Sequence, residues 1–264
     1  VGVGFGKRGT IIDAHVLKKN SVSTKEGKSI PGLNFNDSLV VLALLNSVYA
    51  QYIINLYCGD HKQAGYVNLI PLPSYKRDDI IEKVSKIIEL KQFWTSIDET
   101  CLEFRHLLHF FATAKSVKSR IPEIQNEIAK DRQQYLSLIK ENDDYWIEKA
   151  EIPDNQKKIF EDYKSKRPTE NLISIDGVTD QTIENNPVIA WEIVSNLLGI
   201  AFGRWDIRGV LNPKLIPTSA DYFEALPFMP VVSLSELPEQ YPIQIPFDGI
   251  LVNDGSHSRS LIKA

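Results

Sequence analysis

The sequence has little cysteine, which limits the compartments that suit the protein. Its 264 residues include 2 cysteines, Cys58 and Cys101. Two cysteines cannot build the disulfide network that stabilises small secreted domains, so we expect a reducing, cytoplasmic environment. The sequence also lacks a run of about 18 apolar residues, the length that a membrane-spanning helix needs. We therefore expect no membrane partner.

The sequence also lacks an overall excess of positive charge. Its formal net charge is -4, which excludes a protein that is basic throughout. The first 33 residues differ, because six basic side chains stand there against Asp13 and Glu26. The six are Lys7, Arg8, Lys18, Lys19, Lys25 and Lys28. A local basic face of this kind favours contact with nucleic acid, although an ordinary solvated surface explains the same charges.

Recognisable catalytic motifs are missing as well. The glycine-rich start, VGVGFGKRG, fits neither a Walker loop nor the dinucleotide-binding pattern, because the spacing of its glycines is wrong for both. An adenine methylase needs an Asn-Pro-Pro-Tyr-like motif to hold the amino group of a flipped base. Asn186-Pro187 is the nearest match, but Val188 follows it. We expect no catalytic residue in this chain.

Potential metal ligands are few and scattered. Cys58 and His61 have the spacing of half a zinc site, but no second pair lies nearby. His106 and His109 stand one helical turn apart among apolar residues, where partly buried histidines are common. Asp248 and Asp254 lack the lysine that a nuclease of the PD type places after its second acid. We expect no metal site.

The first 75 residues predict a small mixed or antiparallel sheet with packed helices. Strands are expected around Phe5 and over residues 10–17, and residues 21–33 are expected to form a loop. Asn36 or Asp37 is expected to cap a helix whose apolar run ends at Asn46-Ser47, and a second helix follows it. Residues 66–72 predict an edge strand, because prolines end it.

The rest of the chain predicts helices and then an extended end. A helix capped by Ser74 is expected first, and another is expected over residues 102–114. Residues 121–150 predict one long helix with Pro122 in its first turn, followed by a shorter helix over residues 156–166. An apolar helix over residues 188–202 precedes sixty proline-rich residues. We expect an α+β fold with a recognition-like region (1–75), a helical spacer (76–166) and a proline-rich wrap that packs back on the rest (167–264).

Four stretches resemble one family of DNA-modifying proteins. They are Leu44-Leu45-Asn46-Ser47, the GYVNLIPLP segment at residues 65–73, LLGIAFGRWDIR at residues 197–208 and YPIQIPFDGILVNDGSH at residues 241–257. In this order they resemble the target-recognition and C-terminal region of Eco57I-type restriction-modification proteins. That group includes the large adenine methylases of BREX- or DISARM-like phage-defence systems.

The resemblance implies a partner and a division of labour. Double-stranded DNA would be the ligand, and a catalytic domain before Val1 would transfer methyl from S-adenosylmethionine to adenine N6. No cofactor is expected in this chain itself. The parent's own methyltransferase domain, and other defence-system subunits, would be its protein partners.

Further DNA-contact candidates come from the turn before the GYVNLIPLP segment and from the later GRWDIR motif. Gln63 can read adenine and Tyr66 can stack on a base, while Lys62 can attract phosphate. Tyr66 also fits a core position. Arg204 and Arg208 can contact phosphate, although an ion pair with Asp206 explains them equally well.

Two other functions remain open at this point. The long helix and the proline-rich end also suit a protein-interaction module of a defence complex that reads no bases. A free-standing hydrolase that uses His106 and His109 is a third alternative.

Overall fold

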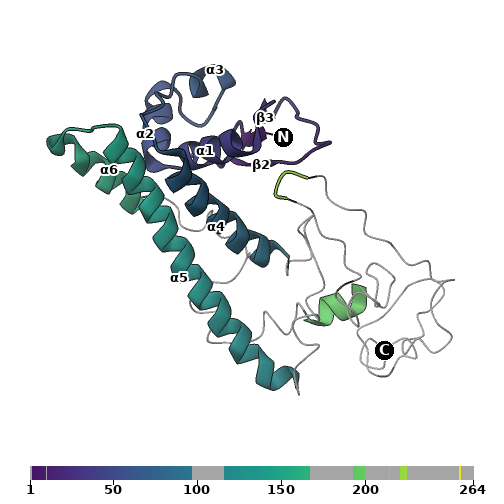
Figure 1. The fold of residues 1–264 in the computed structure, drawn as a ribbon. Coiled ribbons are helices and arrows are strands. Elements are labelled where there is room, and N and C mark those ends of the chain that lie inside the picture. The colour runs from purple at the N-terminus through teal and green to yellow at the C-terminus, as the bar shows by residue number, and fades with distance from the viewer. Residues whose placement is uncertain are drawn as a thin grey trace. The chain divides into compact units, whose positions relative to one another are not determined.

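A computed structural model describes residues 2–9, 11–96, 116–166, 193–199, 214, 221–224 and 256. These residues form a mixed α+β fold with a small antiparallel sheet (Figure 1), which confirms the expected fold class at this level. The strands are β1 (Gly2–Gly6), β2 (His15–Leu17) and β3 (Gly27–Pro31). The main helices are α1 (Phe35–Leu45), α2 (Val48–Tyr57), α3 (Ala64–Val67), α4 (Arg77–Thr95), α5 (Val117–Lys149) and α6 (Asp154–Lys166).

The chain divides into two compact units, and the candidate interface described below belongs to the first. That unit comprises Val1–Phe93, Glu127–Ser174 and Ser219–Leu226. The second comprises Trp94–Asn126, Ile175–Thr218 and Pro227–Ala264, and within it residues 193–199 are helical, inside the apolar helix expected from the sequence. The helix expected over residues 102–114 lies outside the described residues, as does nearly all of the proline-rich end. The three regions expected from the sequence stay a prediction.

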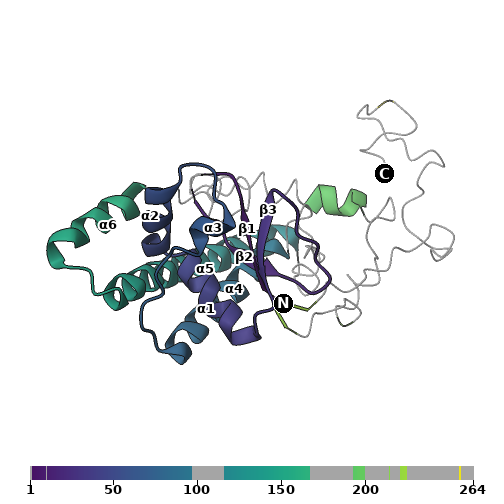
Figure 2. The ribbon, with the colours of Figure 1, turned by 90° about the horizontal axis from the view of Figure 1, so that it is seen from above.

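The sheet has the order β2-β1-β3, with both pairings antiparallel. Val3 and Phe5 of β1 are fully buried, as expected for alternate residues that face a core. Glycines occupy the other positions. A Cβ at Gly2 would lie 2.3 Å from the main-chain oxygen of Ile30. The lack of a side chain at Gly2 therefore allows β3 to approach β1 closely at this end of the strand. Figure 2 shows the two strands beside each other.

Two predictions about this sheet were wrong in part. β3 forms inside residues 21–33, where we expected a loop. Its five residues pair along the whole of β1. The sequence gives little sign of this strand, because Ile30 is its only large apolar side chain apart from Pro31. The strand expected over residues 10–17 is reduced to His15–Leu17. Ile12 is buried outside it, and its N–H donates to Gln51 Oε1 on α2 at 2.7 Å instead of to a strand.

The break between α1 and α2 follows the prediction from Asn46-Ser47. Ser47 caps α2, and its side chain accepts a hydrogen bond from the N–H of Ala50 at 3.2 Å. The cap of α1 is Asn34, rather than Asn36 or Asp37, and its Oδ1 accepts from the N–H of Asp37 at 2.8 Å. α1 packs on β1 and β2. In the described part of the chain, no single helix is long and apolar enough to cross a membrane, and α1 with α2 passes that test only as a pair bent by 68°.

The predicted edge strand over residues 66–72 is wrong. Residues 64–67 form the short helix α3, and the chain continues in turns: Leu69 N–H donates to Tyr66 O at 3.0 Å and Ile70 N–H to Val67 O at 3.1 Å. These local hydrogen bonds use the donors that a sheet ladder would need, and Pro71 has no N–H to offer. Pro71 O instead accepts from the Tyr49 hydroxyl at 3.2 Å.

The long helices begin elsewhere than expected, but they pack on the same core. α4 begins at Arg77, three residues after Ser74, and α5 begins at Val117, so Pro122 lies inside it rather than in its first turn. Lys83 of α4 pairs with Glu141 of α5 at 3.2 Å. Figure 1 shows these helices side by side, and α6 folding back to contact α2. Trp146 of α5 is fully buried in the core.

Candidate nucleic-acid interface

Two loops of the first unit are joined by main-chain hydrogen bonds. We call residues 7–9 and 59–63 the paired loops. Arg8 and His61 form an isolated antiparallel bridge. Lys62 N–H donates to Lys7 O at 2.6 Å, and Gly9 N–H donates to Asp60 O at 3.0 Å. Residues about fifty positions apart are thereby brought to one place on the surface.

The buried side chain of Lys62 forms hydrogen bonds with both paired loops. Its ammonium donates to the carbonyl oxygen of Gly9, and a second contact to Gly59 O measures 3.4 Å. Lys62 is fully buried, so this candidate does not present its charge at the surface. Burial lowers the pKa of Lys62 below its ordinary value, because the charged form is less well solvated inside the protein. Its charge acts on the loops rather than on a ligand.

The other basic residues of the paired loops are partly neutralised. Lys7 and Arg8 both pair with Glu26, at 3.2 Å and 3.4 Å. The pKa of Glu26 is lowered, chiefly because its carboxylate accepts a hydrogen bond from Lys7. The Lys7 side chain is only 12% exposed, whereas that of Arg8 is 72% exposed. Arg8 is therefore the basic side chain that this region offers to a ligand.

Gln63 and Tyr66 extend this surface. Gln63 is exposed where the paired loops enter α3, and Tyr66 on α3 is 38% exposed. The alternative that Tyr66 belongs to the core is wrong. The described surface thus places a guanidinium, an amide and an aromatic ring within two connected loops and the helix that follows them.

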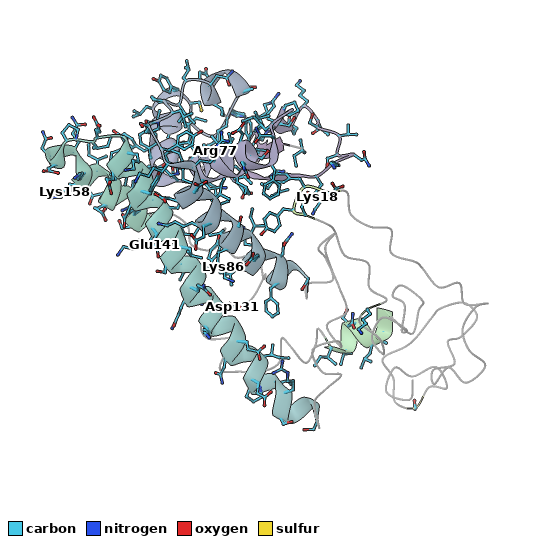
Figure 3. The ribbon with its side chains drawn as sticks, in the orientation of Figure 1. Lys18, Arg77, Lys86, Asp131, Glu141 and Lys158 are labelled. Carbon is cyan, nitrogen blue, oxygen red and sulfur yellow. The ribbon has the colours of Figure 1, made fainter. Side chains whose placement is uncertain are left out.

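The remaining lysine candidates lie on the strands or just after them. Lys25 is exposed before β3, and Lys28 is half-buried within β3 opposite Phe5. Lys18 and Lys19 follow β2, and both contact residues 221–224 (Figure 3 labels Lys18). Arg204 and Arg208 lie outside the described residues, as do His106, His109, Asp248 and Asp254.

Sequence reasoning missed two features of this surface. His61 was weighed as a metal ligand or a simple loop histidine, but its main chain forms a bridge with that of Arg8 across the loops. Several large apolar side chains on and near α2 and α3 are exposed. They are Leu56, Tyr57, Leu69 and Leu72. The first two were expected in the apolar set of the second helix, and the other two in the edge strand over residues 66–72. For Leu69 and Leu72 the proximity of Pro71 and Pro73 was the available signal, because residues at the end of a regular element lose its burial pattern.

The described residues contain no group of three or more side chains suited to hold a metal ion. Cys58 is half-buried, and its thiol donates to the carbonyl oxygen of Ile54 at 3.4 Å. No model of a known protein family matches the sequence, and no curated protein matches it significantly.

Proposed function

We propose that the first unit binds duplex DNA and reads its base edges as the recognition region of a site-specific adenine-N6 DNA methyltransferase or a fused type II restriction-methylase. A catalytic domain outside this chain would transfer the methyl group from S-adenosylmethionine. In this proposal α4, α5 and α6 are the helical spacer, and the proline-rich end is an extended wrap. The resemblance carried by the four stretches supplies the methyltransferase context.

The observation that carries the DNA-binding proposal is the grouping of Arg8, Gln63 and Tyr66 around the paired loops. Arginine donates two parallel hydrogen bonds to guanine in the major groove, and glutamine can pair with adenine in a similar way. A tyrosine ring can stack on an unpaired base. The main-chain hydrogen bonds between the paired loops hold these groups in a fixed arrangement. Base readout requires such an arrangement because hydrogen bonds are directional.

Binding of a duplex DNA pool by the whole chain, measured by fluorescence anisotropy over a salt series, tests the proposal. We expect Arg8→Ala to weaken binding. If Arg8 contacts phosphate, the slope of log K against log salt becomes shallower by about 0.9. Lys158→Ala is the matched control, because Lys158 is an exposed cation on α6 (Figure 3). Equal affinities of both variants and the wild type would remove the paired loops from the interface.

A second experiment tests whether the region chooses the DNA sequence. Methylated adenines would be mapped in DNA from cells that carry the full-length parent, with residues 1–73 native or exchanged for those of a relative. We expect the methylated motif to change while methylation persists. An unchanged motif with persistent methylation would place recognition elsewhere.

The exposed apolar side chains favour one alternative function. Leu56 and Tyr57 end α2, Leu69 and Leu72 follow α3, and α2 contacts α3. Exposed apolar patches on soluble proteins often mark protein contacts, so this surface suits a scaffold module of a phage-defence complex. Such a module would retain its protein partner after nuclease treatment and lose it in Leu56→Ser/Leu69→Ser. Loss of the partner on nuclease treatment alone would instead favour DNA as the link.

A further inference from the structure

A short segment late in the chain covers the two lysines that follow β2. We call residues 221–224, Asp-Tyr-Phe-Glu, the acidic turn. Its carbonyl groups accept hydrogen bonds from this strand end: Lys19 N–H donates to Phe223 O at 2.7 Å, and Lys18 Nζ donates to Tyr222 O at 3.1 Å. Figure 3 shows Lys18 beside this turn.

The acidic turn is anchored by its aromatic residues. Phe223 is 1% exposed, and its ring meets that of Phe35 edge-on at 5.4 Å between centroids. Tyr222 stacks on Phe35 at 6.0 Å, and its hydroxyl donates to Glu89 of α4 at 3.2 Å. Asp221 shapes the turn, because its carboxylate accepts from the main-chain N–H groups of Phe223 and Glu224.

Glu224 is the residue of the turn whose side chain pairs with a candidate DNA contact. Its carboxylate pairs with the Lys19 ammonium, and the two side chains remain 32% and 49% exposed. The pKa of Lys19 is raised, chiefly by its hydrogen bond to Glu224, so Lys19 stays charged beside the turn. A carboxylate oxygen here occupies the kind of position that a DNA phosphate oxygen takes on a lysine.

We propose that the acidic turn competes with DNA phosphate for Lys19, so that this position of the interface is closed until nucleic acid displaces Glu224. This inference rests on the proposed DNA-binding function. The exchange does not require Phe223 to leave the core, because the Glu224–Lys19 pair is solvent-accessible while Phe223 is buried. The aromatic anchor keeps the competing acid close to the lysines.

A double-mutant cycle on the whole chain tests the competition. The affinity for a duplex DNA pool would be measured for the wild type, Glu224→Gln, Lys19→Ala and the double variant. We expect Glu224→Gln to tighten binding about two- to fivefold at low salt, the range expected from releasing one exposed ion pair. In the Lys19→Ala background, Glu224→Gln should tighten DNA binding only by the amount expected from removing one negative charge anywhere on the surface.

Glu161→Gln measures that general effect, because Glu161 is an exposed acid on α6 that pairs with Lys164 instead. Equal gains from Glu224→Gln with and without Lys19, or no gain with Lys19 present, would overturn the competition and leave the DNA-binding proposal intact. If neither the wild type nor Glu224→Gln binds DNA, the proposed function itself fails, and the competition fails with it.

Discussion

Asp143 on α5 accepts a hydrogen bond at 2.7 Å from the main-chain N–H of Val48, 95 positions earlier in the chain. Val48 is the first residue of α2, and both residues are buried. The first N–H groups of a helix have no partner inside the helix, and the helix dipole favours a negative charge there. Asn142 adds a bond to Ala43 O at 2.9 Å. The C-terminal half of α5 is thus fastened to the bend between α1 and α2.

We expect Asp143→Ala to lower the free energy of unfolding by about 1–3 kcal/mol, because it leaves a buried N–H without its acceptor. Asp143→Asn should cost less, since its side-chain oxygen can still accept. Urea unfolding of the whole chain measures both. Glu148→Ala, at an exposed position on the same helix, is the control. Equal losses for Asp143→Ala and Glu148→Ala would contradict the proposed role of this bond.

The buried ammonium of Lys62 should make stability depend on pH. Its pKa is lowered in the folded protein below the ordinary lysine value of 10.5, chiefly by burial. Between the folded pKa and 10.5 the unfolded chain binds more protons than the folded one, so stability rises with pH across that window and the penalty is fully present below it.

Comparison of the wild type with Lys62→Met isolates this effect, because the other titrating groups are common to both proteins. The wild type should gain stability relative to Lys62→Met as the pH rises toward 10.5, with a slope of at most about 1.4 kcal/mol per pH unit for one proton. Chemical unfolding at several pH values up to that limit provides the measurement. A difference that stays constant, or falls, would show that burial does not depress the pKa of Lys62.

The parts of the fold that the sequence predicts correctly are those set by neighbouring residues. The break at Asn46-Ser47 interrupts a strongly apolar run, and Ser47 is a good helix cap, so the pattern alone predicts two helices. β3 was missed because its five residues carry little periodic signal. What holds it is hydrogen bonding with β1, about 25 positions earlier, which no local pattern contains.

The candidate site was predictable only in part, for the same reason. Arg8, Gln63 and Tyr66 were identified by residue type and are exposed. The burial of Lys62 depends on loops about fifty positions apart. Lys19 is paired with Glu224, which lies 205 positions away. Charge in a sequence shows which side chains can meet a ligand, but the folded chain decides which of them already have a partner.

The docking of α6 on α2 includes a buried aromatic contact that can be tested with a neighbouring control. Phe160 is 3% exposed, and its ring meets that of Tyr52 on α2 at 5.0 Å. Phe160→Ala should cost about 3–5 kcal/mol, the usual range for a buried phenylalanine. Ile159→Ala, at a position 43% exposed, should cost much less. Thermal unfolding of both variants decides, and equal losses would mean that α6 is not docked through Phe160.

The glycines of β1 make a sharper test, because two of them face different obstacles. A Cβ at Gly2 would lie 2.3 Å from the main-chain oxygen of Ile30, whereas at Gly4 the nearest atom is Nε2 of the His15 side chain, at 2.5 Å. A main-chain atom held in a ladder cannot move aside, but the exposed His15 ring can rotate away. Gly2→Ala should therefore destabilise by about 1–3 kcal/mol, the usual cost of overpacking, and Gly4→Ala by less.

Removing the His15 ring separates the two cases. His15→Ala should restore the stability lost in Gly4→Ala, and it should leave the loss in Gly2→Ala unchanged, because Ile30 O is still in place. Urea unfolding of the two double variants beside the single ones measures this. If His15→Ala rescues both glycine variants equally or neither of them, the contacts across β1 differ from those described. Selective rescue would establish that β1 is closed on one side by main chain and on the other by a movable ring.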